Sequence, residues 1–307
     1  MLTDLGHLRT FVTVAEECHL TRAAERLHIS QSAASSHIRA LEENLGFNLF
    51  SRTNRNLELT RAGELMLMRA RVLLGEEAQF ASFACELRGK MEGTLSVSAS
   101  SESGTRVGEV VTALREAHPL VTIDLCTRPS NGARQALKSG ELDVSIFLGR
   151  AGDPLFTIHE IEDVEFCIAA PAAWHDEVKD AGWEELSRMP WITPNASSAR
   201  AGMLSELFSQ RGIELNSVVR FTNGALGRTV LEAGGGLMML RKDIAHRGRD
   251  AGTLCICPLA TTRFPVSIVH LTSRARDPLI NAFLDASTVV WPHFKRVPAE
   301  ASMPLKS

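Results

Sequence analysis

The chain has 307 residues, of which 44% are hydrophobic and 22% charged, and its formal net charge is −3 at pH 7. This length allows two or three domains with a sizeable core, and the charge balance excludes a protein that is basic throughout. There is no apolar run of about 18 residues and no basic segment followed by an apolar one at the N-terminus, so we expect a cytoplasmic protein without a membrane partner.

The first sixty residues predict three short helices and a hairpin. The first and second helices, near 5–15 and 21–27, have apolar residues at spacings of three and four. The third runs from Gln31 to about Asn44, with Ser30 as its expected N-cap. After it, the segment "FNLFSRTNRNLELT" has apolar residues on both sides of a polar turn, which predicts a small two-stranded wing.

The third helix has one small, polar face opposite its apolar stripe. Ser32, Ser35, Ser36 and Arg39 lie at positions i, i+3, i+4 and i+7, so they share this face. Small hydroxyl groups would let a helix approach a DNA groove closely, and the pattern predicts a helix-turn-helix. A merely solvated face is the alternative, and it stays open because residues 1–61 hold seven basic and seven acidic residues.

A long helix is predicted from Thr60 to about Arg88. Met66, Leu73, Phe80 and Leu87 are seven residues apart, which is typical of a coiled-coil seam, although Glu77 interrupts the alternate heptad position. We therefore expect the chain to form a homodimer through this helix. The alternative is that the stripe packs against its own domain.

After a hinge within "RGKMEGT" (88–94), the pattern changes to alternating strands and helices. A β-α-β-α-β series over 95–148 predicts a parallel sheet with right-handed crossovers. A second series follows, with expected strands at 164–169, 217–221, 236–240 and 254–258 and helices at 199–210 and 225–233. A last strand (264–272) and helix (278–291) would return to the first series, which predicts two α/β subdomains.

The N-terminal sixty residues resemble the DNA-binding domain of LysR-type transcriptional regulators. The resemblance rests on "HLRTFVTVAEE", "TRAAERLHISQSAAS", "IRALEENLG", "LFSRTNR" and "LTRAG", and it extends to "LKSGELDVSIF" and "LEAGGGLMML" further along the chain. It implies a multidomain α/β protein: a winged helix-turn-helix, a dimerising linker helix and a periplasmic-binding-protein-like effector domain of two α/β subdomains. The expected boundaries are 1–60 for the DNA-binding domain, 61–88 for the linker helix, 89–93 for the hinge, 94–161 with 267–295 and 162–266 for the two effector subdomains, and 296–307 for a tail.

The family resemblance implies partners and DNA-contacting positions. The partners are double-stranded DNA, a second copy of the chain in a homodimer and in a homotetramer, and a small-molecule effector, with RNA polymerase as a further candidate. The resemblance places Gln31, Ser32 and Ser35 at recognition-helix positions and Arg55 in the wing. Together with the polar face and the wing pattern, the expected DNA-binding residues are Thr21, Ser30, Gln31, Ser32, Ser35, Ser36, Arg39, Arg52 and Arg55. Two positions depart from many family members: Ser32 replaces a proline and Ser36 an arginine. The second change removes a candidate guanine contact and leaves the base preference open.

Polar loops at strand ends predict an effector site between the two subdomains. Hydroxyl and amide groups gather where helices begin, which suits a carboxylate or another anion. The expected effector-binding residues are Ser100, Ser101, Ser103, Ser130, Phe147, Thr193, Asn195, Ser197 and Ser198. Each serine could equally be an ordinary helix cap.

Two other classes of function are less favoured by the sequence. Catalysis is disfavoured because the chain has no nucleophile-elbow, phosphate-loop or zinc-protease motif, and no cofactor or metal site is expected. A redox-sensing regulator is the main alternative to a ligand-responsive one. The six cysteines have no repeated spacing, and Cys126 and Cys167 are expected to be buried and inert in strands. Only Cys255 and Cys257 form a close pair, with a weak suggestion of metal or redox chemistry.

Overall fold

The computed structural model describes residues 4–52, 57–87, 91–99, 106–149, 153–195, 198–294 and 296–297. The chain divides into two compact units. The N-terminal unit comprises residues 1–93 with 136–141, and the C-terminal unit comprises 94–135 with 142–307.

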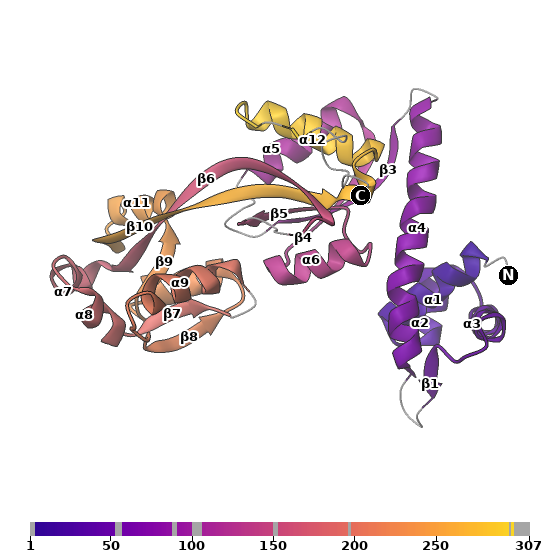
Figure 1. Ribbon diagram of the computed structural model, residues 1–307, viewed down its shortest axis with the longest axis horizontal. Helices are drawn as coiled ribbons and strands as arrows, with labels where there is room; N and C mark the ends of the chain where they lie inside the picture. Colours follow the sequence, from indigo (N-terminus) through magenta and orange to yellow (C-terminus); the bar gives the residue numbers. More distant parts are fainter. Residues whose placement is uncertain are drawn as a thin grey trace, which may run out of the picture. The chain divides into compact units, whose positions relative to one another are not determined.

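Three helices and a two-stranded wing begin the N-terminal unit (Figure 1). The elements are α1 (Leu5–Glu17), α2 (Leu20–Arg26), α3 (Gln31–Leu45), β1 (Phe50–Arg52), β2 (Leu57–Leu59) and the long helix α4 (Arg61–Leu87). Ser30 caps α3 as expected, because its hydroxyl accepts a hydrogen bond from the backbone N–H of Ala33 at 3.1 Å. His28 has φ of 54° in the turn before α3, a left-handed conformation that histidine adopts more readily than most residues.

The apolar faces of these helices meet in one core. Phe11 and Phe50 pack edge to face with their ring centroids 5.6 Å apart, joining α1 to the wing. The carboxylate of Glu42 in α3 accepts hydrogen bonds from the backbone N–H groups of Leu49 and Phe50 at 2.8 and 3.2 Å. Helix α3 and the wing are therefore held together by both apolar and polar contacts.

Helix α4 packs one face against this core and leaves another exposed. Ala70 is buried in the core, and Met66 packs partly buried against it. Glu77 pairs with Arg9 of α1 at 2.6 Å, which explains the acidic residue that interrupts the heptad pattern. Leu73 and Phe80 face away, with 51% and 77% of their surface exposed. The side chain of Leu87 lies outside the described residues.

The C-terminal unit is built around a mixed six-stranded sheet, in the order β4-β3-β5-β10-β6-β9. Its first part consists of β3 (Glu92–Ala99), α5 (Val107–Ala117), β4 (Leu120–Cys126), α6 (Ser130–Lys138) and β5 (Val144–Leu148). Strands β3 and β5 are parallel, as the β-α-β pattern predicts. The complete sheet is mixed, because β10, whose direction the pattern did not predict, runs antiparallel to both β5 and β6.

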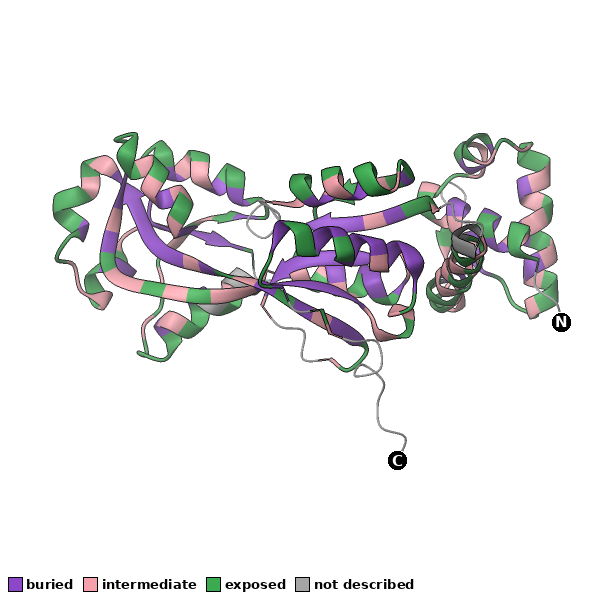
Figure 2. Cartoon of the chain, turned by 90° about the horizontal axis from the view of Figure 1, so that it is seen from above, coloured by how far each residue is buried: buried purple, intermediate pink, exposed green. Residues whose placement is uncertain are grey.

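Two long antiparallel strands, β6 (Phe156–Pro171) and β10 (Leu254–Leu271), run through both parts of this unit (Figure 1). The segments 254–258 and 264–272, expected as separate strands, belong almost entirely to β10. The register shifts between Cys257 and Thr261, so the interval between the two expected strands is a bulge within one strand. Figure 2 shows that buried residues follow these strands.

The second part of the unit adds a parallel strand pair and several helices. The other elements of the C-terminal unit are η1 (Ala172–Trp174), α7 (His175–Val178), α8 (Trp183–Arg188), β7 (Trp191–Pro194), α9 (Ala199–Ser209), β8 (Ser217–Phe221), α10 (Gly224–Glu232), β9 (Met238–Arg241), α11 (Lys242–Asp250), η2 (Thr272–Arg274) and α12 (Pro278–Val290). Of these, α12 packs against α5 of the first part. Helices α7, α8 and α11 were not anticipated. Trp191 of β7 packs against Phe208 of α9, with ring centroids 5.3 Å apart. Among the helices of the described residues, none combines the length and apolar character needed to cross a bilayer.

A buried histidine pair joins β6 to β10. His159 Nε2 and His270 Nε2 are 3.0 Å apart. The carbonyl of Leu271 accepts a hydrogen bond from His270 Nδ1, and the backbone N–H of Val297 donates to His159 Nδ1. His159 must therefore donate to His270, and both rings are neutral. Burial and the positive neighbours lower the pKa of His159 to about 3, and burial lowers the pKa of His270.

This pair predicts acid sensitivity of the C-terminal unit. In the unfolded chain a histidine has a pKa near 6.5 and binds a proton below that pH, whereas the folded rings stay neutral. The contribution of the pair to the free energy of unfolding is therefore fully present above pH 6.5. For His159 this contribution falls as the pH drops from 6.5 towards 3, by up to about 1.4 kcal/mol per pH unit, and His270 adds a loss in the same direction. Arg274 and Arg296 oppose protonation, whereas Asp277 favours it at His270.

Urea unfolding of the wild type and of a double His159→Phe, His270→Phe variant between pH 7.5 and 4.5 measures this effect. The double variant should lose less stability on acidification, whereas His246→Gln, on α11, should behave like the wild type. Equal losses in the wild type and the double variant would contradict the assignment.

Candidate functional site

The N-terminal part of α3 presents the predicted recognition face. Gln31, Ser32, Ser36 and Arg39 are exposed, while Ala34, Ile38 and Leu41 on the opposite side are buried. The hydroxyls of Ser30 and Ser32 lie 2.9 Å apart, within hydrogen-bonding distance, at the start of the helix. The same helix thus anchors to the core on one side and offers small polar groups on the other.

Ser35 and Thr21 are less accessible than the other predicted DNA-binding residues. Both are half-buried, and Ser35 lines a small hollow of about 20 Å³ with Glu42, Phe50 and Leu57. Ser36 and Ser32 therefore offer more surface to a duplex than Ser35 does. Arg55 and the side chain of Arg52 lie outside the described residues.

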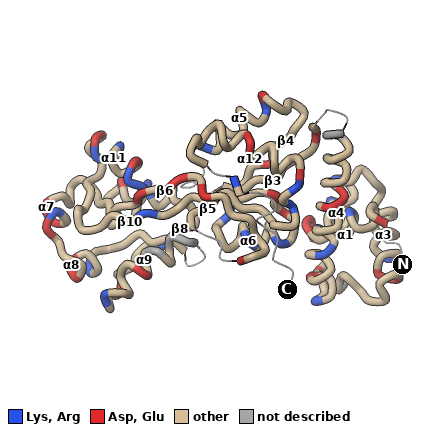
Figure 3. Tube along the Cα trace, turned by 45° about the horizontal axis from the view of Figure 1, so that its top comes forward, with Lys and Arg blue, Asp and Glu red and all other residues tan. Residues whose placement is uncertain are grey.

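Ion pairs neutralise most of the arginines of the first two helices. Arg26 contacts Glu16 and Glu17 at 2.9 and 3.3 Å, and Arg9 contacts Glu77. Figure 3 shows that acidic and basic positions both occur along the helices of this unit. Arg39 is exposed and forms no ion pair with a described residue. Residues 1–61 therefore contain equal numbers of acidic and basic residues, but these are unevenly distributed. The positive charge of Arg39 on α3 is available to a partner.

The predicted effector-binding residues that are described lie in two parts of the C-terminal unit. Ser130 is the first residue of α6 and is half-buried. Phe147 of β5 is fully buried, and the guanidinium of Arg134 in α6 lies over its ring at 5.3 Å. Arg134, one turn beyond Ser130, is a cationic group that sequence reasoning missed. Its spacing of four from Ser130 was the available signal.

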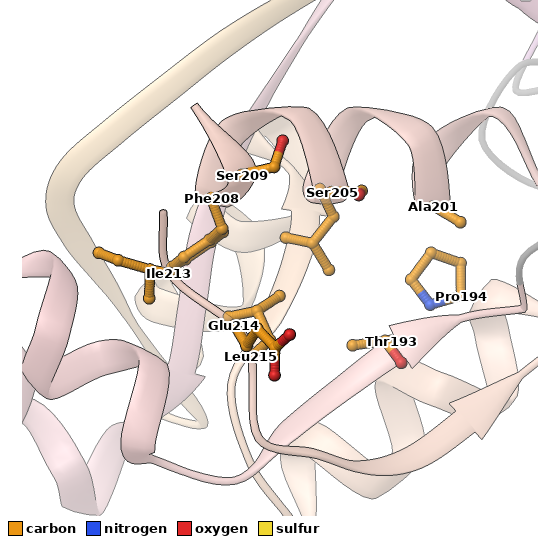
Figure 4. A pocket seen from close by; sticks show the side chains of 10 residues that line it. Thr193, Pro194, Ala201, Ser205, Phe208, Ser209, Ile213, Glu214 and Leu215 are labelled. Atoms are coloured by element: carbon orange, nitrogen blue, oxygen red, sulfur yellow. The ribbon is translucent and has the colours of Figure 1, made fainter. Parts of the chain in front are cut away.

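The predicted effector-binding residues within β7 and directly after it have different surroundings from Ser130 and Phe147. Thr193 is buried and lines a cavity with Pro194 and Ala201 (Figure 4). Asn195 is exposed, and Ser198 is half-buried. Neither Ser130 nor Phe147 lines this cavity, so it does not unite the two predicted groups. Ser100, Ser101, Ser103 and Ser197 lie outside the described residues.

Three of the cysteines gather around one cavity of about 540 Å³ beside α11. Burial raises the pKa of Cys167 to about 11, and it also raises the pKa values of Cys255 and Cys257. These groups are therefore protonated thiols near neutral pH. The expectation for Cys126 was wrong, because β4 is the edge strand of the sheet and leaves this thiol exposed.

No metal centre is evident in the described part of the chain. No group of three or more His, Cys, Asp or Glu side chains there is arranged to hold a metal ion.

A winged helix-turn-helix followed by a long helix and a mixed α/β unit is the architecture of a DNA-binding transcriptional regulator with a ligand-binding domain. Residues 5–64 match the model described as "Bacterial regulatory helix-turn-helix protein, lysR family", and residues 88–290 match "LysR substrate binding domain". The chain belongs to the LysR family of bacterial transcriptional regulators, which are DNA-binding proteins rather than enzymes.

Comparisons with individual proteins agree with this assignment. The transcriptional regulators TfdS of Cupriavidus pinatubonensis and IlvY of Escherichia coli are 29% and 27% identical to this chain, covering 92% and 91% of it and 97% of each relative. The solved structure of full-length OxyR from Pseudomonas aeruginosa has a TM-score of 0.72 at 22% identity and covers 97% of this chain and 99% of that one. The structure of full-length CbnR with its target DNA has a TM-score of 0.65 at 22% identity, covering 93% and 99% of the two chains.

Proposed function

We propose that the chain binds double-stranded DNA through α3 and the wing, and that a small anionic effector bound between the two effector subdomains modulates this binding or the activation of transcription. The observation that carries the DNA-binding part is the exposed polar face of α3 with its available Arg39. Helix α3 has small side chains on that face, so its backbone can approach a major groove closely. CbnR, a protein of the same fold, has been solved with its target DNA.

Replacing Arg39 by alanine should weaken binding to every duplex, because it removes a charge directed at phosphates. The slope of log K against log[salt] should become shallower by about 0.9 for one lost contact. Fluorescence anisotropy over a salt series measures this slope. Arg26→Ala is the matched control, since Arg26 is already paired with Glu16 and Glu17 and should leave the slope unchanged. An unaltered slope in the Arg39 variant would remove it from the interface.

Support for an anionic effector comes from the start of α6. Ser130 can donate a hydrogen bond there, and Arg134 adds a positive charge one turn later. Substituting Ser130 by alanine should reduce the response to effector while DNA binding stays intact, as measured by footprinting with candidate metabolites. Loss of DNA binding without effector would mean that Ser130 has a purely structural role. The expected contributions of Thr193, Asn195, Ser198 and Phe147 remain part of the same proposal.

Cysteine oxidation is less well supported as the signal. The three thiols beside α11 are buried and held protonated, and reactive cysteines are accessible thiolates instead. A cysteine-free variant should therefore retain effector-dependent DNA binding. Oxidation-dependent binding in the wild type, lost in that variant, would favour redox sensing instead.

We also propose that the chain forms a homodimer through α4. A homotetramer and a contact with RNA polymerase are further predictions. Leu73 and Phe80 are large apolar side chains that the chain itself leaves exposed. Burying a phenylalanine contributes about 1.5–3 kcal/mol, so Phe80→Glu should weaken dimerisation by at least about tenfold. Analytical ultracentrifugation measures this change. Leu155→Glu, another exposed apolar position, is the control, and equal dissociation constants for both variants would contradict the seam.

A further inference from the structure

A cavity of about 460 Å³ lies beneath α9, within the second part of the C-terminal unit. Its walls come from β7, from α9 and from the segment 213–215 that precedes β8 (Figure 4). This volume is in the range that small organic ligands occupy in proteins. Neither Ser130 nor Phe147 lines the cavity, so it is distinct from the first half of the predicted effector site; of the predicted effector-binding residues that are described, only Thr193 lines it.

The body of the cavity is apolar. Leu204 and Phe208 of α9 are almost fully buried at its inner wall, and Pro194, Ile213 and Leu215 complete the lining. Phe208 is fixed from both sides, because its ring packs edge to face against Trp183 and Trp191 at 5.2 and 5.3 Å. The wall is therefore preformed, and an apolar ligand would not have to displace it.

The cavity is lined by one charged side chain, Glu214, and by the hydroxyls of Thr193, Ser205 and Ser209, which can both donate and accept hydrogen bonds. Figure 4 shows the carboxylate of Glu214 directed from the loop into the space below α9. Glu214 is exposed and forms no ion pair with a described residue. Thr193 lies across the space, and its hydroxyl contacts the Ser217 hydroxyl at 2.6 Å and the Val219 carbonyl at 3.4 Å, so its oxygen keeps lone-pair capacity.

We infer that this cavity is a second ligand site, for an organic ammonium ion with a small apolar body. The apolar part would lie against Leu204 and Phe208, and the ammonium group would donate to the Glu214 carboxylate. Such a ligand has the opposite charge to the effector proposed for the other site. The chain would then sense two chemically different molecules.

The position of the cavity suggests what binding does. Helix α9 begins at Ala199, directly after the segment that carries Asn195 and Ser198 of the proposed effector site. A ligand that fills the space beneath α9 restricts the motion of this helix. It therefore also restricts the first turn of α9, which follows the segment with Asn195 and Ser198. Binding at one site therefore changes the affinity of the other, and the coupling is reciprocal.

The test uses the full-length protein with phenethylammonium as the probe and 3-phenylpropionate as an anion with a similar apolar body. Isothermal titration calorimetry measures both affinities for the wild type, for Glu214→Gln and for Glu206→Gln, which removes the same charge from α9 at a residue that does not line the cavity. Hydrogen exchange of residues 199–209, with and without the probe, reports directly on α9.

We expect phenethylammonium to bind the wild type and Glu206→Gln equally. It should bind Glu214→Gln about fivefold more weakly, because the substitution removes one partly exposed ion pair between the ammonium group and the Glu214 carboxylate. Exchange in α9 should slow when the probe binds. Equal affinity for the anion, equal binding by Glu214→Gln, unchanged exchange in α9 or no binding by the wild type would overturn the inference. Because none of these measurements involves DNA, they succeed or fail independently of the proposed recognition by α3.

Discussion

Replacing Gly63 by alanine is expected to destabilise the DNA-binding domain by about 3 kcal/mol, because overpacking against rigid backbone cannot be relieved cheaply. A Cβ atom at this position would lie 2.1 Å from the carbonyl oxygen of Leu49. That carbonyl accepts a hydrogen bond from the backbone N–H of Thr60 at 2.9 Å, and Thr60 in turn caps α4 through the N–H of Gly63. The substitution must therefore separate the wing from the start of the long helix.

Gly75 provides the matched control for this prediction. It lies in the same helix, and a Cβ atom there would meet nothing within 4 Å. Gly75→Ala should therefore stabilise the helix by up to about 1 kcal/mol. Thermal unfolding followed by circular dichroism, together with DNA-binding assays, measures both variants. Similar melting temperatures for Gly63→Ala and the wild type would show that the wing and α4 are not held in the close contact described above.

The second large effect is expected at Arg274, the last residue of η2, which follows β10. Its guanidinium contacts Asp143 and Asp277, the latter at 2.6 Å, and all three side chains are largely buried. Asp143 also accepts a hydrogen bond from the backbone N–H of Ser96 at 2.6 Å, and Asp277 caps α12. Arg274→Ala leaves two buried carboxylates without their cation, which costs about 3–5 kcal/mol.

Arg276→Ala controls for the loss of a positive charge in the same segment. Arg276 is exposed, and its substitution should change stability by less than about 0.5 kcal/mol. Urea unfolding of the full-length protein, followed by tryptophan fluorescence, separates the two variants. Equal midpoints would mean that the Arg274 cluster contributes nothing to the C-terminal unit.

The sequence predicts the N-terminal unit well because its signals are local. The cap at Ser30 and the apolar stripe of α3 follow from residues three and four positions apart, and the helix spans Gln31–Leu45 as the pattern indicates. Helix propensity, capping and burial all favour the same element there. The pairing of Glu77 with Arg9, 68 residues apart, has no such local signal.

The sheet of the C-terminal unit was harder to predict. Strand β10 combines two apolar stretches separated by "PLATTR", an interval that begins with a proline and breaks the strand pattern in the sequence. In the structure this interval contains the bulge between Cys257 and Thr261. Strand direction also depends on pairing between distant segments, such as Val266 with Leu148, which periodicity does not report. The position of Arg134 over Phe147 is another product of tertiary packing.

Selection of bound sequences from randomised duplex DNA tests the central claim most directly. The full-length wild type should enrich one two-fold symmetric motif, since a dimer reads two half-sites. Ser36→Ala should enrich a motif altered at the same position of both half-sites, because Ser36 is exposed on the proposed groove-facing side of α3. Enrichment of no motif by the wild type, or of an identical motif by both proteins, would contradict base recognition by this face.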